Sequence, residues 1–172
     1  MESRAKAFGH PIHPMLIPFP LGLLSTAVVF DLIHLFSGDG KWADIAFYMV
    51  AAGIVGGVAA ALFGWIDWFA IPADTRAKRV GLMHGGGNAL VLVLFALSWL
   101  LRLDAPRSPE ALALVLSFAG VALAGFTGWL GGELVDRMGV GVDHGANLDS
   151  PNSLSGKPAA DGATRSVRAA NR

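Results

Sequence analysis

Four long apolar blocks dominate the sequence, at residues 15–36, 45–71, 80–101 and 111–135. Each block reaches the roughly 20 residues that an α-helix needs to cross about 30 Å of hydrocarbon. Backbone amides inside a bilayer have no water to bond with, so a single segment of this length crosses it as a helix. The blocks therefore predict an all-α chain, an integral membrane bundle of four transmembrane helices.

The composition agrees with a membrane location and excludes several functions. Only 15% of the residues are charged and 53% are hydrophobic, whereas ordinary soluble domains carry about 25% charged residues. The net charge is zero and no basic stripe is present, so we expect no nucleic-acid partner. The chain has no cysteine, which rules out disulfides, thiolate metal sites and ligation of an iron–sulfur cluster by this chain.

The placement of lysine and arginine predicts the orientation of the helices. One side of the predicted bundle carries most of these residues: Arg4, Lys6, Arg76, Lys78, Arg79, Arg137, Lys157, Arg165, Arg168 and Arg172. The other side carries only Lys41, Arg102 and Arg107. Because positive charge is enriched on the cytoplasmic side, we expect both termini in the cytoplasm and a multi-pass protein of the bacterial inner membrane.

The composition changes near residue 145. Residues 1–144 contain all four apolar blocks, whereas residues 145–172 are rich in Gly, Ser, Pro, Asn and Ala and show no apolar period. Such a segment buries too little apolar surface to offset its ordering entropy. We therefore predict a four-helix membrane domain over 1–144 and a disordered cytoplasmic tail over 145–172.

Small residues and a weak internal similarity suggest how the helices pack. Gly53 and Gly57 form one small-xxx-small pair and Gly128 and Gly132 another, which lets helices approach closely, either within the bundle or in a homo-oligomer. Gly64-Trp65 in the second block is matched by Gly128-Trp129 in the fourth. The similarity indicates either a tandem repeat of two helical hairpins or the ordinary resemblance of apolar helices.

Ionisable residues cluster at the predicted cytoplasmic end, where each helix contributes one. They are His13 before the first helix, Asp67 in the second, His84 in the third and Glu133 in the fourth, with His10, Asn88 and Asp136 as further members. Charged groups within membrane helices are costly, so each needs a partner or a purpose. Imidazole and carboxylate groups that converge from facing helices can bind a divalent transition metal. Two histidines alone can instead serve as the axial ligands of haem b.

The same residues also allow a simpler interpretation as a satisfied polar network. Asp67 can pair with a nearby arginine, and Glu133 with Arg137 four residues later. The prolines around His10 and His13 favour an extended lead-in to the first helix. His84 is the hardest to explain in this way, because it lies within an apolar block beside three glycines.

A second polar layer is predicted at the opposite end of the bundle. Asp31 and His34 lie three residues apart on the first helix, and Arg102 follows the third. The spacing predicts a hydrogen-bonded Asp31–His34 pair capped by Arg102. We interpret this outer polar pair as structural.

Several motifs in order resemble a known family. They are His10-Pro11-Ile12-His13-Pro14, Pro18-Phe19-Pro20-Leu21-Gly22, Asp31, Gly64-Trp65-Ile66-Asp67-Trp68, His84 and Gly128-Trp129-Leu130-Gly131-Gly132-Glu133-Leu134-Val135. The series is similar to a bacterial family of small four-helix membrane proteins with no established activity. Members of that family occur joined to, or beside, Rieske-type ferredoxin domains, and the resemblance implies a redox setting with a separate ferredoxin-type partner.

Together these patterns predict a non-enzymatic membrane protein with a histidine–carboxylate site at its cytoplasmic face. The site would hold haem b, with His84 and either His13 or His10 as axial pair, or a metal ion bound by His13, Asp67, His84 and Glu133. The alternative is a structural or scaffold protein whose inner polar cluster only stabilises packing. A small transporter is a third interpretation, disfavoured because the middle of each span has few polar groups.

Overall fold

A computed structural model describes residues 1–162 and confirms a nearly all-helical chain. Its four long helices are α2 (Pro18–Ser37), α3 (Gly40–Ala70), α4 (Arg76–Leu100) and α5 (Ala111–Gly132). The short helix α1 (Ile12–Leu16) leads directly into α2. With α1 counted as part of the first span, the described residues contain four helices long and apolar enough to cross a membrane.

The helices begin and end where local side chains satisfy the free backbone groups. Asp39 caps α3, since its carboxylate accepts the Lys41 amide at 2.9 Å, and Thr75 caps α4 by accepting the Lys78 amide at 3.1 Å. Gly38 ends α2 with a left-handed φ of 69°, a conformation that costs glycine little. The caps lie in the short connections from α2 to α3 and from α3 to α4, whereas the loop from α4 to α5 is longer.

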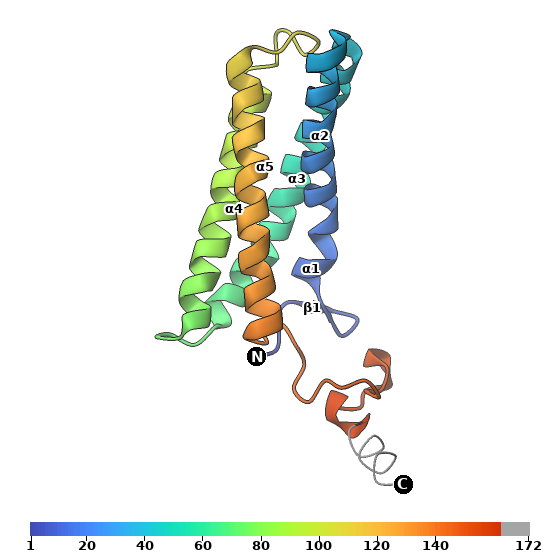
Figure 1. The fold of residues 1–172 in the computed structure, drawn as a ribbon. Helices are drawn as coiled ribbons and strands as arrows, with labels where there is room; N and C mark the ends of the chain where they lie inside the picture. Colours follow the sequence, from blue (N-terminus) through green and yellow to red (C-terminus); the bar gives the residue numbers. More distant parts are fainter. Residues whose placement is uncertain (163–172) are drawn as a thin grey trace.

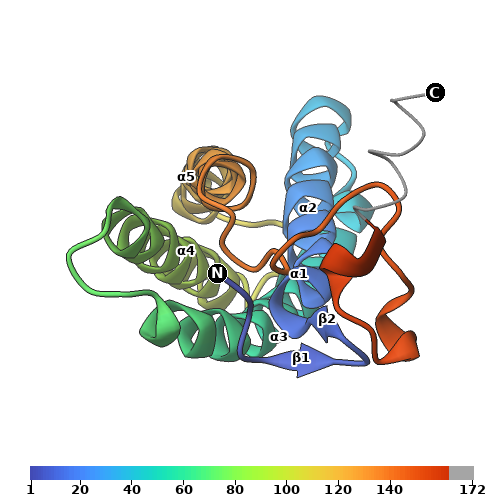
Figure 2. The ribbon, with the colours of Figure 1, turned by 90° about the horizontal axis from the view of Figure 1, so that it is seen from below.

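The helices form two antiparallel hairpins, α2 with α3 and α4 with α5, which pack along α3 and α4 (Figures 1 and 2). Helices α2 and α5 make few contacts with each other. The core lies between the hairpins and is built from apolar residues of α2, α3 and α4: Leu24, Ala27, Val28, Ala46, Val50, Val91 and Phe95. The outward faces stay apolar and exposed, as expected of helices that contact lipid.

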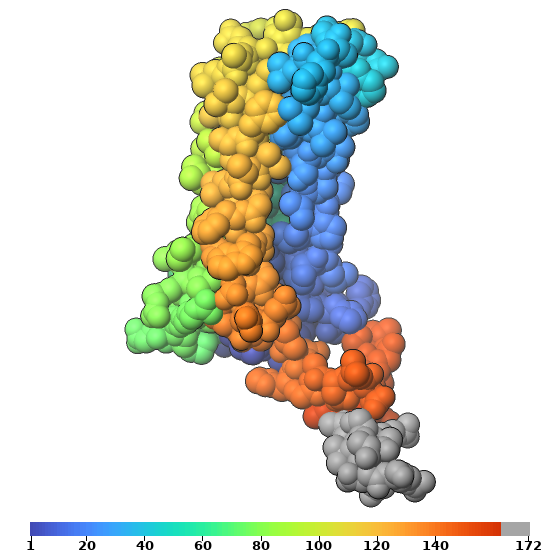
Figure 3. Space-filling view, viewed as in Figure 1, coloured from blue at the N-terminus to red at the C-terminus, as the bar shows by residue number. Residues whose placement is uncertain are grey.

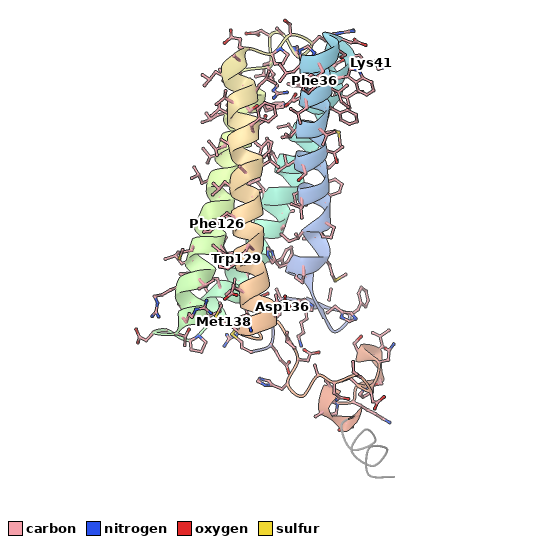
Figure 4. The ribbon with its side chains drawn as sticks, viewed as in Figure 1. Phe36, Lys41, Phe126, Trp129, Asp136 and Met138 are labelled. Carbon is pink, nitrogen blue, oxygen red and sulfur yellow. The ribbon has the colours of Figure 1, made fainter. Side chains whose placement is uncertain are left out.

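The N-terminal segment and the described part of the C-terminal tail, up to residue 162, lie at the same end of the bundle (Figure 1). A small antiparallel hairpin, β1 (Lys6–Ala7) and β2 (His10–Pro11), precedes α1 and turns at Phe8 and Gly9, both with positive φ. Phe36 and Lys41 lie at the opposite end of the bundle (Figure 4). The N-terminus and residues 138–162 thus lie on one side of the bundle, and the cytoplasmic location of both termini remains a prediction.

After α5 the chain makes a π-helical turn, η1 (Glu133–Arg137), and continues below the bundle (Figure 3). The tail contains two short 3₁₀ helices, η2 (Ser153–Ser155) and η3 (Ala159–Gly162). It contacts the N-terminal segment: the Gly141 amide donates to the Met1 carbonyl at 2.8 Å, and Lys6 forms ion pairs with both Glu2 and Asp143. Disorder over 145–172 stays a prediction, and residues 163–172 lie outside the described residues.

Candidate functional site: a histidine pair between the two hairpins

His13 is held against the second helix of its own hairpin. It lies in α1 and not in the extended lead-in that its flanking prolines predicted, because proline is tolerated in the first turn of a helix. Its Nδ1 atom lies 2.8 Å from the Ala60 carbonyl oxygen of α3. Gly64, one turn further along α3, makes room for the ring, since a Cβ there would lie 2.9 Å from two of the imidazole atoms.

His84 is held in the same way in the second hairpin. It lies in α4, and its Nδ1 atom is 2.8 Å from the Thr127 carbonyl oxygen of α5. Gly131, again four residues further, lies against the ring, where a Cβ would be 3.1 Å from the imidazole. The Thr127 hydroxyl donates to the Asn88 side chain at 2.9 Å, and the Asn88 amide nitrogen lies 3.3 Å from His84 Nε2.

The two hairpins thus share one contact pattern: a histidine ring lies against a backbone carbonyl, and a glycine four residues after that carbonyl packs against the ring. The sequence similarity aligned Gly64 with Gly128, but the contact geometry matches Gly64 with Gly131, which is about one helical turn away. A register difference of this size keeps the same helix face toward the bundle. The repeated contact is therefore clearer in three dimensions than in the sequence.

The structure brings the two histidine rings together where the hairpins meet. The ring centres of His13 and His84 lie 6.3 Å apart, and the ring planes are perpendicular, at 90°. Both residues are half-buried. If each Nδ1 donates to its carbonyl, then each Nε2 carries the lone pair and is the nitrogen available to a ligand.

Asp67 binds the N-terminal segment of the chain and not the His13 ring. Its carboxylate accepts the Ser3 hydroxyl, 2.8 Å from each oxygen, together with the backbone amides of Arg4 at 2.8 Å and Ala5 at 3.2 Å. The carboxylate thereby fastens the N-terminal segment to α3. No sequence pattern indicates this role, because the partners are mostly backbone amides.

The remaining inner residues also have partners other than the histidines. Glu133 forms an ion pair with Arg76 at 2.7 Å and a longer one with Arg137 at 4.0 Å. Asp136 is exposed in η1, just beyond α5 (Figure 4), and His10 is exposed, with Nε2 3.3 Å from the Ser153 hydroxyl. Within residues 1–162, no three histidine or acidic side chains come close enough to hold a metal ion.

The outer polar layer is built differently from the predicted Asp31–His34 pair. Asp31 and Arg102 are fully buried and form a bidentate ion pair, with distances of 2.7 and 2.8 Å. His34 turns away from this pair, and its Nδ1 lies 3.1 Å from the Asp39 carbonyl oxygen. Asp31 lies on the buried face of α2 with Leu24 and Ala27, whereas His34 lies near the exposed end of that helix, so the two cannot share a partner.

Two buried serines complete the outer layer and join it to α5. The Ser117 hydroxyl accepts from Arg102 at 2.9 Å and lies 2.8 Å from the Ser98 hydroxyl. Ser98 also donates to the Ala113 carbonyl at 2.7 Å. The spacing of Ser98, in the last turn of an apolar run, and Arg102, four residues later and just past its end, was the available sequence signal for this network.

Four long apolar helices, with the N-terminal segment and the described part of the tail on one side and polar clusters at each end of the bundle, define a multi-pass membrane protein of the four-helix class. The chain belongs to the DUF2231 family of predicted membrane proteins, whose model matches residues 9–144. No curated protein matches the sequence, and no solved structure matches the fold. The lipid environment follows from the family and the helices together.

Proposed function

We propose that the protein binds haem b between His13 and His84 and carries electrons in the bacterial inner membrane. The observation that carries this proposal is the spacing of the two rings. A metal–imidazole bond is about 2.0–2.1 Å long and places each ring centre roughly 3.2 Å from the metal, so two opposed axial rings have centres about 6.4 Å apart. The centres of His13 and His84 are 6.3 Å apart. The perpendicular ring planes are compatible with two ligands on one metal, because each ring would be able to turn about its own metal–nitrogen bond.

The anchoring of both rings supports the same function. Histidines that bind metals commonly donate their other ring nitrogen to a backbone carbonyl or a carboxylate, which fixes the tautomer and the ring orientation. The Ala60 and Thr127 carbonyls, each 2.8 Å from Nδ1, can do this for His13 and His84. His13 would then offer Nε2 with little reorganisation, whereas at His84 the Asn88 amide nitrogen, 3.3 Å from Nε2, would have to give way to the ligand.

The surroundings of the pair contain small residues and one weakly packed side. Gly64 of α3 and Gly131 of α5 face the two rings, where a Cβ would lie 2.9 Å from the His13 ring and 3.1 Å from the His84 ring. Because α2 and α5 make few contacts, separating them to admit a flat ring system breaks little packing. The bound group would bridge the two hairpins.

Haem b supplies reversible one-electron transfer, and the protein residues would orient it and tune its potential. The predicted orientation places the site toward the cytoplasm. Because the chain has no cysteine, an iron–sulfur partner would have to be a separate protein of the ferredoxin type. A four-ligand metal ion is the weaker form of this proposal, since Asp67 and Glu133 would both have to leave their present partners.

A second candidate is a structural or scaffold protein without a cofactor. One contact favours it: the Asn88 amide lies 3.3 Å from His84 Nε2 and can satisfy that nitrogen by itself. The buried Asp31–Arg102 pair likewise joins helices without offering an open site. In a scaffold protein both histidines would only join neighbouring helices through their hydrogen bonds to the Ala60 and Thr127 carbonyls.

An optical spectrum of the purified protein separates these candidates. The chain is expressed in bacteria supplied with a haem precursor and purified in detergent, and haem content per chain is measured. We expect a Soret band and the sharp visible bands of six-coordinate low-spin iron on reduction. His84→Ala and His13→Ala should each abolish the six-coordinate spectrum, while His34→Ala, which alters a histidine at the opposite end, should leave it intact.

Three other outcomes would count against haem. A wild-type protein that stays colourless, even after incubation with haem, would exclude the proposal. Near-stoichiometric metal without a Soret band would favour the metal ion. A protein that contains neither haem nor metal, and in which His84→Ala lowers only thermal stability, would favour the scaffold.

A further inference from the structure

The N-terminal segment docks along one stripe of α3. Ala60, Gly64 and Asp67 are spaced by four and three residues and therefore share a helix face. The Ala60 carbonyl oxygen lies within hydrogen-bond distance of the His13 ring nitrogen, and Gly64 leaves room for the ring because it has no side chain. Asp67 binds the backbone that precedes His13. The ring and the segment before it are thus held by successive turns of one helix.

The Asp67 carboxylate makes an extensive set of contacts with this segment. It accepts from the Ser3 hydroxyl and from the amides of Arg4 and Ala5. Ser3 and Ala5 are buried, and the Ala5 amide also lies 3.2 Å from the Ser3 hydroxyl oxygen. Hydrogen bonds to a charged acceptor are roughly twice as strong as neutral ones. No other side chain of α3 hydrogen-bonds to the segment over residues 3–5 in the described chain.

The helix that carries His13 is poorly secured by its own backbone. Helix α1 is five residues long, and prolines at positions 14, 18 and 20 lack the amides that would bond to the carbonyls four residues earlier. His84, in contrast, lies inside the 25-residue helix α4 and is backed by Asn88 and Thr127. The two rings are therefore anchored unequally.

We infer that Asp67 is a positioning residue for His13, which makes His13 the axial ligand that depends on the docked N-terminal segment. The inference rests on the proposed haem site. The Ile12 amide at the start of α1 donates to the Ala5 carbonyl at 2.9 Å, so release of the segment would free α1 at its N-terminal end and leave the ring with its hydrogen bond to Ala60 and its packing on Gly64. His84 would keep its place and retain the iron. The docked N-terminal segment would thus hold His13, but not His84, in place for a haem bound by both residues.

Asp67→Asn tests this inference, with Glu133→Gln as the matched control. Both positions are carboxylates at the same end of the bundle, but Glu133 pairs with Arg76 and not with the N-terminal segment. Hydrogen–deuterium exchange of the purified full chain should be faster by about tenfold or more over residues 3–12 in Asp67→Asn, because amide bonds to a charged acceptor are lost. Glu133→Gln should leave that exchange unchanged.

The optical spectrum gives the second readout. Asp67→Asn should retain haem but shift much of it to the five-coordinate high-spin form, and added imidazole should restore the six-coordinate spectrum. Ser3→Ala, which removes one donor outside the spans, should shift both readouts in the same direction by less. It keeps the test usable if Asp67→Asn does not fold.

The outcomes distinguish the two proposals. A wild-type protein without haem would overturn the proposed function and with it the ligand role of His13. Bound haem that stays six-coordinate and low-spin in both Asp67→Asn and Ser3→Ala would overturn the positioning role alone. Equal effects of Asp67→Asn and Glu133→Gln would also overturn it, since the change would then be general destabilisation.

Discussion

Removal of Asp31 should destabilise the bundle more than removal of any exposed charge. The side chains of Asp31 and Arg102 have no exposed surface, and the carboxylate takes both guanidinium bonds at 2.7 and 2.8 Å. In Asp31→Leu the guanidinium would keep only its bond to Ser117. Removing one partner of a buried ion pair costs about 3–5 kcal/mol, because the other charge is left uncompensated.

Replacement of both partners should cost far less than the single change. A buried pair replaced by apolar residues of similar volume is often neutral or stabilising by about 1–4 kcal/mol. The Nε atom of Arg102 already lacks a hydrogen-bond partner among the described residues, which further reduces what the intact pair contributes. We therefore expect Asp31→Leu with Arg102→Met to recover at least about 3 kcal/mol of the loss in Asp31→Leu.

Thermal unfolding in detergent, followed by tryptophan fluorescence, measures these differences. For a chain of this size, 1 kcal/mol corresponds to roughly 2–4 °C in the midpoint, so Asp31→Leu should lower it by roughly 6–20 °C. His34→Ala, on the same helix but outside the pair, serves as the control and should change little. The reasoning fails if Asp31→Leu behaves like His34→Ala, or if the double variant is as unstable as the sum of both single variants.

Three further predictions follow from the contacts described above. Gly64→Ala and Gly131→Ala should each lose about 1–3 kcal/mol of stability by overpacking against a histidine, whereas Gly128→Ala, with open space around it, should be neutral or slightly stabilising in the same unfolding assay. A spin label on Leu148→Cys should be least mobile between mildly acidic and mildly alkaline pH. Lys6 helps to hold the tail against the N-terminal segment through its ion pair with Asp143. The bonds to Asp143 and Glu2 raise the pKa of Lys6, so the contribution of Lys6 to this docking is lost as pH rises through that raised value. The hydrogen bond from Lys6 lowers the pKa of Glu2, so the contribution of Glu2 to the docking is lost as pH falls through that lowered value. A spin-label mobility independent of pH would contradict both expectations. Single cysteines at Lys41 and Arg107 should react with an impermeant maleimide in spheroplasts, while those at Lys78 and Arg137 should react only after permeabilisation; the reverse result would invert the topology.

The four helices were predictable because long apolar runs leave the backbone one way to satisfy its amides. The predicted blocks overlap α2, α3, α4 and α5 closely, and their ends differ by a few residues where caps such as Asp39 and Thr75 act. The convergence of His13 and His84 at one end also follows from the order of the spans. What the sequence could not show was which carbonyl each ring would meet.

The partners of the acidic residues were harder to predict, because backbone amides leave no pattern in a sequence. Asp67 binds the amides of Arg4 and Ala5 more than sixty residues away, and Glu133 binds Arg76 at a separation of 57 residues. The sequence predicted an Asp31–His34 pair capped by Arg102; Arg102 does bind Asp31, but His34 bonds to the Asp39 carbonyl instead. Long-range packing decided each of these contacts.

The location of the histidine anchors has a consequence for how the molecule assembles. The bond from His13 to Ala60 lies wholly within the first half of the chain, and the bond from His84 to Thr127 lies wholly within the second. Each half can therefore orient its own imidazole before it meets the other. Docking of the halves then has only to bring together two groups that already point correctly, and a ligand held by both imidazoles would report that the halves have joined.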